Sequence, residues 1–257
     1  MILAGKRLLV TGVLTERSLA YPIARQAQEL GGEVVLTGFG RGLRLTHYAA
    51  ESLPRPAEIL ELDVLQDEHF AALGAALAER WEWVDGIVHS IAFAPADVWT
   101  RPFLDVDLDS LDIAMRVSVY SLHRLVGALL PLLERAPGGA SVVGLTVSPA
   151  ARMTPSYAWM SVVKAALDTL VKQLAIQLGG RGIRVNLAAC GPVRTLAGRA
   201  VPGFDDIAGH YLERAPLGWR VDDYTAAAGT TCFLLSDLAA FTTGESVAAD
   251  GGMHAVL

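Results

Sequence analysis

The chain has 257 residues, of which 52% are hydrophobic and 19% are charged, and its formal net charge is -6 at pH 7. This length fits one large α/β domain, which buries enough surface to fold without a disulfide or a structural metal. The negative charge argues against general nucleic-acid binding, and no run of eighteen apolar residues lacks a charge, which argues against a membrane-spanning helix.

Short β-rich runs alternate with segments of helical periodicity along the whole chain. We expect strands at residues 7–10, 33–37, 58–62, 86–89, 141–145, 183–187 and 245–249. We expect helices at residues 19–30, 41–52, 68–81, 108–135 (broken or bent near Pro131), 157–178 and 222–235. The alternation predicts an α/β fold, a Rossmann-type doubly wound seven-stranded parallel sheet in one domain spanning residues 1–257.

The segment after the first strand has features of a dinucleotide loop. Gly12 can form the tight turn, and Ser18, near the start of the next helix, can offer a hydroxyl to a phosphate. The usual three-glycine signature is incomplete, because Glu16 and Ser18 stand where glycines are expected. Taken alone, this segment fits a nucleotide loop and an ordinary turn equally well.

The ends of the next three strands strengthen the nucleotide interpretation. Phe39 follows the second strand and either stacks on an adenine or belongs to the core. Asp63 follows the third strand and either accepts a hydrogen bond from the adenine amino group or caps the next helix. The segment Ser90-Ile91-Ala92-Phe93 follows the fourth strand and is rich in small residues where backbone must pass near a cofactor.

Tyr157 and Lys164 are the strongest candidates for chemistry. Seven positions correspond to two helical turns, so both side chains are expected on one face of a helix. A phenol close to an ammonium group is biased toward donating a hydrogen bond, which stabilises a carbonyl oxygen that gains negative charge during hydride transfer. The alternative is a surface lysine beside a helix-capping tyrosine; the surrounding dinucleotide sheet favours the catalytic interpretation.

Nearly the whole chain resembles the enoyl-[acyl-carrier-protein] reductase family of the short-chain dehydrogenase/reductase superfamily. The matching motifs are Gly12-x5-Ser18-x-Ala20, Leu60-Glu61-Leu62-Asp63-Val64, His89-Ser90-Ile91-Ala92-Phe93, Tyr157-x6-Lys164, Gly191-Pro192-Val193-Arg194-Thr195-Leu196-Ala197 and Ala249-Asp250-Gly251-Gly252. The x6 spacing is specific to the enoyl reductases, whereas carbonyl reductases of the superfamily use x3. Two segments, residues 36–39 and 215–219, are most similar to the mycobacterial, mycolic-acid-type enzyme.

The resemblance implies hydride transfer from NADH to the β-carbon of a trans-2-enoyl thioester, carried on an acyl carrier protein or on CoA. Tyr157 would stabilise the enolate oxygen. The implied cofactor-binding residues are Gly12, Leu14, Ser18, Phe39, Asp63, Val64, Ser90, Ile91, Ala92, Lys164, Gly191, Val193 and Thr195. The implied substrate-pocket residues are Phe93, Val147, Tyr157, Met160 and Leu196.

NADH is preferred to NADPH because the Gly38-Phe39 end of the second strand resembles the NADH-using subgroup. Arg41 and Arg44 follow directly and are the residues that a 2′-phosphate would meet. A comparison of the Michaelis constants for the two cofactors distinguishes these possibilities.

The sequence departs from the family at two places. Val147 stands where family members carry a Tyr or Phe, about ten residues before the catalytic tyrosine. The loss of that ring either enlarges the pocket for a branched or cyclic acyl group or marks a protein without reductase activity. The substrate lid, about residues 195–215, is shorter than in the mycolic-acid-type enzyme, which suggests shorter substrates. Two other functions therefore stay open: a catalytically altered NAD(H)-binding regulator and a short-chain carbonyl reductase.

Composition also bears on assembly and location. Cys190 and Cys232 lie in apolar runs without metal-ligand spacing, which indicates reduced core residues of a cytoplasmic protein and no metal site. The apolar excess fits either a sheet covered on both faces or subunit contacts, and the resemblance implies a homotetramer. Arg194, Arg199 and Arg214 near the lid fit either an acidic acyl carrier protein or an ordinary solvated surface.

Overall fold

A computed structural model describes residues 1–148 and 154–256. Seven strands form one parallel sheet in the order β3-β2-β1-β4-β5-β6-β7. Their bounds are Arg7–Val10 (β1), Glu33–Gly38 (β2), Glu58–Glu61 (β3), Gly86–His89 (β4), Ala140–Val147 (β5), Ile183–Cys190 (β6) and Ser246–Ala249 (β7). The strand order reverses between β1 and β4, so the predicted doubly wound sheet is confirmed.

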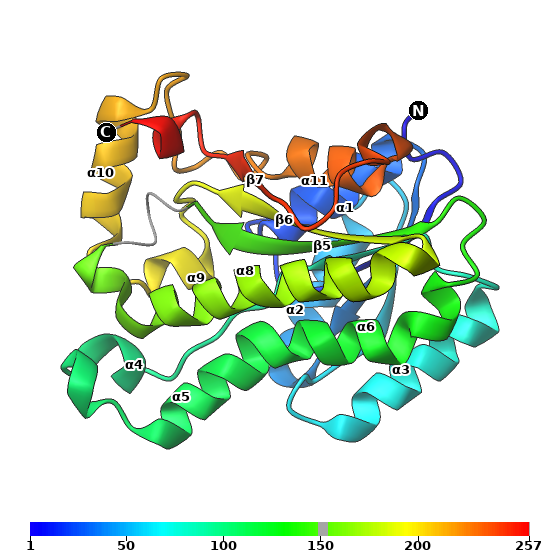
Figure 1. Cartoon of the computed structure of the whole chain (residues 1–257), viewed down its shortest axis with the longest axis horizontal. Helices are drawn as coiled ribbons and strands as arrows, with labels where there is room; N and C mark the ends of the chain where they lie inside the picture. The colour runs from blue at the N-terminus through cyan, green and yellow to red at the C-terminus, as the bar shows by residue number, and fades with distance from the viewer. Residues whose placement is uncertain (149–153, 257) are drawn as a thin grey trace.

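Helices cover both faces of the sheet (Figure 1). Their bounds are Ala20–Glu29 (α1), Leu43–Glu51 (α2), Asp67–Arg80 (α3), Asp97–Thr100 (α4), Leu108–Met115 (α5), Ser121–Leu133 (α6), Ala158–Leu178 (α8), Leu196–Arg199 (α9), Phe204–Arg214 (α10) and Ala228–Leu235 (α11). The helices α3, α5, α6 and α8 pack on one face, and α1, α2 and α11 pack on the other. Each face therefore has its own hydrophobic core, and the central strands are buried on both sides.

The helix is not broken at Pro131, which was one of the two alternatives predicted there; the other, a bend, stays a prediction. Pro131 lies inside α6, and the irregularity instead lies upstream, where a π-helical turn, Arg116–Tyr120, joins α5 to α6. Together these elements form a run, Leu108–Leu133, that is long and apolar enough to cross a membrane by length and composition. Half of the most apolar stretch of that run is buried in the protein, as is typical of a core helix.

Other differences from the sequence prediction lie at element ends and in the loops. Strands β5 and β6 run to Val147 and Cys190, beyond the predicted ends. Helix α11 begins at Ala228 rather than near residue 222. The short helix α4, between β4 and α5, was not predicted. It matters for the site, because it packs against α8 and places Trp99 beside Tyr157.

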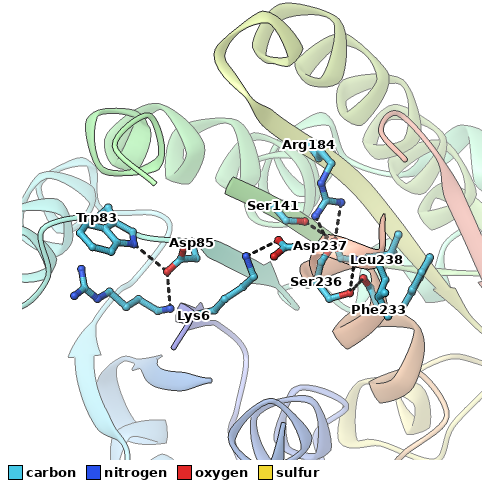
Figure 2. A network of polar contacts seen from close by, with 11 residues as sticks. Lys6, Trp83, Asp85, Ser141, Arg184, Phe233, Ser236, Asp237 and Leu238 are labelled. Carbon is cyan, nitrogen blue, oxygen red and sulfur yellow. Dashed lines mark hydrogen bonds and ion pairs between the residues drawn. The ribbon is translucent and has the colours of Figure 1, made fainter. Parts of the chain in front are cut away.

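A polar network fixes the opposite, amino-terminal edge of the sheet (Figure 2). The guanidinium of Arg184, at the start of β6, donates to the carbonyls of Leu234 and Ser236 at 2.8 and 3.1 Å, and so caps the end of α11. The hydroxyl of Ser141, at the start of β5, donates to the same Leu234 carbonyl at 2.8 Å. These bonds satisfy carbonyls at the end of α11 that have no partner within the helix. They lie at the opposite edge of the sheet from the carboxyl ends of the strands, where the functional residues are expected.

Candidate active site

The loop after β1 lies at the reversal of strand order. Gly12 has φ +84°, and a Cβ atom on it would lie 2.0 Å from the carbonyl oxygen of Ser90. The hydroxyl of Thr11 donates to Val88 O at 3.0 Å and accepts from the Ser90 amide at 3.2 Å. Two backbones thus pass in close contact where a dinucleotide is expected to bind, and only glycine fits there.

Ser18 organises this loop. Its Oγ accepts hydrogen bonds from the amides of Leu14 and Thr15, both at 3.1 Å. Because the oxygen accepts both bonds, the hydroxyl hydrogen is what this serine can offer to a phosphate. The Thr46 hydroxyl donates to the Val13 carbonyl at 2.9 Å and ties helix α2 to the same loop.

The structure decides two alternatives that the sequence left open. The side chain of Phe39 is 51% exposed, so it is not a core residue and is free to meet a ligand ring. Helix α3 begins at Asp67 with Gln66 at its N-cap, so Asp63 does not cap it. Asp63 accepts from the Leu65 amide at 3.0 Å, and Val64 beside it is buried.

The segment after β6 supplies the other wall of the expected cofactor site. A Cβ atom on Gly191 would lie 2.7 Å from the Trp219 ring, so the backbone is in close contact there. Val193 is buried, and Thr195 caps the short helix α9 by accepting from the Gly198 amide at 2.9 Å. The backbone of this segment is therefore held from both sides.

Tyr157 and Lys164 are both buried below the carboxyl ends of β4 and β5, with side chains 7% and 4% exposed. The ammonium of Lys164 donates to the Leu145 carbonyl of β5 at 3.3 Å. The ring of Tyr157 packs edge-on against Trp99 of α4, with centroids 5.9 Å apart. The pair therefore has the burial expected of catalytic groups rather than of a surface lysine beside a cap.

The geometric reason given for the pair is wrong, however. Helix α8 begins at Ala158, and Tyr157 belongs to the preceding 3₁₀ turn, Pro155–Tyr157. Ala158 has φ +42°, a positive value rare for a residue with a Cβ. Two uninterrupted helical turns do not connect the two residues. The strained turn, stabilised by Trp99, instead sets the direction of the tyrosine.

His89 is a fully buried histidine whose role sequence reasoning did not single out. Burial, together with the positive charge of Lys164, lowers the pKa of His89 to about 3, so its imidazole is neutral. Its Nε2 lies 2.8 Å from the Ser121 hydroxyl, which itself donates to the Val117 carbonyl at 2.6 Å. The proton of the imidazole therefore lies on Nε2, which donates to Ser121.

The predicted substrate residues fall into two places. Tyr157 and Met160 are buried in the core beneath the site, and Val147 is partly buried against the same core. Phe93 is largely exposed. Leu196 is 59% exposed and lines a surface cavity of about 430 Å³ with residues of the β1 loop and α2, including Arg17 and Tyr48. Its role toward the acyl group stays a prediction.

Sequence reasoning also missed the aromatic residues of α4 and its neighbourhood. Trp99 contacts Tyr157, while Phe103 stacks on Trp159 with centroids 4.7 Å apart and planes 7° apart. The Trp159 indole donates to the Phe103 carbonyl at 2.7 Å. Trp99 therefore places a ring beside Tyr157, although Val147 carries none. No motif or clear periodicity of the sequence singled out these aromatic residues.

The segment predicted to form the lid, about residues 195–215, contains the helices α9 and α10. Arg194 is paired with Asp205 at 3.3 Å and with Asp222 at 3.8 Å, so its charge is already compensated within the chain. Tyr211 of α10 is buried and packs edge-on against Trp219 at 5.8 Å. Helix α10 is thus packed onto the domain through this aromatic contact, and Arg199 lines two surface cavities beside the segment.

Comparison with known proteins accords with this geometry. A family model described as enoyl-(acyl carrier protein) reductase matches residues 12–254. The NADH enoyl-[acyl-carrier-protein] reductases of Mycolicibacterium smegmatis and Mycobacterium avium are 43% and 40% identical, each over 98% of this chain and 97% of their own. The enzyme named FabI of Bacillus subtilis is 36% identical over 98% of this chain and 97% of its own. The match with mycobacterial relatives and the shared motifs lead to one conclusion: this chain belongs to the enoyl-[acyl-carrier-protein] reductase family.

Proposed function

We propose that the chain reduces a trans-2-enoyl thioester to the saturated acyl thioester by hydride transfer from NADH. The observation that carries this proposal is the buried Tyr157–Lys164 pair beneath a loop where Gly12 and Ser90 pass in close contact. Family membership supports the reaction class. The names of the two mycobacterial relatives, which are enoyl-[acyl-carrier-protein] reductases, specify NADH.

The described residues fit the nicotinamide dinucleotide that this reaction requires. The bound cofactor supplies the hydride. We assign the pyrophosphate to Gly12, Ser18 and Thr195, because a glycine turn, a hydroxyl and a helix N-terminus converge after β1 and β6. The exposed ring of Phe39 suits an adenine, with Asp63 and Val64 next to it in the site.

Within this site the phenol of Tyr157 donates to the thioester carbonyl oxygen as that oxygen gains enolate character. The nearby ammonium of Lys164 favours this donation electrostatically and is positioned by the Leu145 carbonyl. Protonation of the α-carbon then gives the saturated product. His89, which is neutral, adds no competing positive charge beside Lys164.

We infer that residues 195–215 form the lid over the acyl group and that an acyl carrier protein docks beside it. Two aspartates balance the positive charge of Arg194. We therefore assign the positive charge that attracts an acidic carrier protein to Arg199 and Arg17, which line the same cavity. CoA remains the alternative carrier. The test compares kcat/KM for the same acyl group on the two carriers, in the wild type and in Arg199→Ala. Docking through Arg199 predicts that the substitution lowers kcat/KM with the protein carrier only.

The proposal is tested with NADH and a panel of linear, branched and cyclic enoyl thioesters, followed at the nicotinamide absorbance band. Tyr157→Phe is expected to lower kcat by about 100-fold or more, as for removal of an oxyanion donor. Tyr21→Phe is the matched control: it removes a phenol hydroxyl that bonds to Ser52 and takes no part in the proposed reaction. NADH binding without turnover of any thioester favours the regulator, and reduction of a ketone instead favours a carbonyl reductase.

We also propose a cytoplasmic homotetramer. Large apolar side chains stay exposed on α8, at the start of α5 and on the segment before it, among them Ile176, Leu108 and Leu104. Exposed apolar surface of this kind is typical of subunit contacts. Light scattering after size-exclusion chromatography is expected to give four times the chain mass of 27.3 kDa, and a monomer would contradict the assignment.

A further inference from the structure

The π-helical turn Arg116–Tyr120 is an irregularity that the proposed reaction does not explain. The amide of Ser121 reaches back five residues to the carbonyl of Arg116, which widens the helix for one turn. Such turns interrupt an α-helix at an energetic cost and occur often at functional sites. This one lies in the middle of the α5–α6 run, which packs against α8, the helix that carries Lys164.

Ser118, inside this turn, is fully buried and holds the backbone of Phe93 through two hydrogen bonds. The Phe93 amide donates to the Ser118 hydroxyl oxygen at 3.1 Å, and the hydroxyl donates to the Phe93 carbonyl at 3.2 Å. One side chain thus satisfies both the donor and the acceptor of a single loop residue. The reciprocal pair fixes the position of that peptide more tightly than either bond alone.

Ser121, which ends the turn, holds the other end of the same loop. It accepts the Nε2 proton of His89 at 2.8 Å, and His89 is the last residue of β4. The turn therefore contacts the segment His89–Phe93 at both ends. Between these anchors lie Ser90, Ile91 and Ala92, which form no part of a helix or strand.

We propose that Ser118 is a positioning residue: its reciprocal hydrogen bonds to Phe93 hold the segment Ser90–Phe93 in the conformation that receives the nicotinamide half of the cofactor. The inference rests on the proposed function, because the family resemblance implies that Ser90, Ile91 and Ala92 of this segment bind NADH. The π-helical turn brings the serine to the loop, and helix α6 holds it there.

The test is Ser118→Ala in the full-length protein, with NADH affinity measured by fluorescence titration in the absence of acyl substrate. Loss of one net hydrogen bond changes an equilibrium constant roughly fivefold, so the Kd for NADH is expected to rise about fivefold to 25-fold. Hydrogen exchange of the peptide covering residues 90–95 is expected to accelerate. KM for NADH should rise more than kcat falls, because the groups that act on the thioester are unchanged.

Ser141→Ala is the matched control. Ser141 is an equally buried serine whose hydroxyl donates to Leu234 at the opposite edge of the sheet (Figure 2). Its variant is expected to lose thermal stability but to keep the wild-type Kd and the wild-type exchange of residues 90–95. If Ser118→Ala does not fold, Ser118→Cys replaces the hydroxyl by a weaker donor of similar size and gives the same comparison.

The inference is overturned if Ser118→Ala lowers the melting temperature as Ser141→Ala does while leaving the Kd for NADH and the local exchange unchanged. Neither readout needs turnover, so the result is independent of which acyl thioester is reduced. A wild-type protein that binds NADH but reduces no thioester would refute the proposed function and leave the role of Ser118 in cofactor binding standing.

Discussion

The neutral, buried imidazole of His89 makes the free energy of unfolding depend on pH below about pH 6.5. Burial, aided by the charge of Lys164, lowers the pKa of His89 to about 3, whereas an unfolded histidine titrates near 6.5. Below pH 6.5 the unfolded chain therefore binds a proton at this histidine, whereas the native protein does not. The contribution of neutral His89 to the free energy of unfolding is fully present above pH 6.5 and is lost progressively as the pH falls toward 3.

The size of the effect follows from the two pKa values. A pH of 5 is about 1.5 pH units below the pKa of the unfolded histidine, and each unit lowers the free energy of unfolding by about 1.4 kcal/mol. We therefore expect His89 alone to lower the free energy of unfolding by about 2 kcal/mol between pH 7 and pH 5. His89→Gln keeps an N–H donor near Ser121 but does not titrate, so this variant should lack that part of the decline.

The assay is urea unfolding at fixed protein concentration at pH 5, 6, 7 and 8, with the change in free energy compared between proteins. His123→Gln is the control, because His123 is exposed on the same helix α6 as Ser121. It should retain the wild-type dependence on pH. Equal losses of stability in wild type and His89→Gln between pH 7 and pH 5 would refute the claim that His89 is buried in the neutral form.

Three further predictions concern the cofactor loop, the thiols and the acyl pocket. Gly12→Ala should abolish measurable NADH binding, because its Cβ atom would lie 2.0 Å from the Ser90 carbonyl; a wild-type Kd by fluorescence titration would contradict the contact. Burial raises the pKa of Cys190 and of Cys232 to about 12, so iodoacetamide at pH 8 should label the urea-unfolded chain but not the native one; rapid labelling of the native protein by mass spectrometry would count against both. Trp99→Ala opens space beside Tyr157 and should change the ratio of kcat/KM for a branched over a linear enoyl thioester about tenfold; an unchanged ratio would show that the indole does not line the acyl pocket.

Sequence periodicity determined the sheet almost completely. Buried parallel strands require continuous apolar runs, and their helices require a 3.6-residue period, so both patterns are visible without tertiary information. The positions of Gly12, Tyr157 and Lys164 followed from motifs of fixed spacing. The burial of Tyr157 and Lys164 beneath one end of the sheet accords with that interpretation.

Tertiary contacts decided what local patterns do not encode. The π-helical turn formed at Arg116–Tyr120 rather than a break at Pro131, because Ser118 and Ser121 bond to a loop that precedes them by about 25 to 32 residues. The exposure of Phe39 and the edge contact of Trp99 on Tyr157 likewise depend on which segments meet in space. The sequence by itself determined the sheet and the candidate chemistry. Only the folded chain decided how the loop after β4 is held, since side-chain hydrogen bonds between distant segments leave no periodic trace.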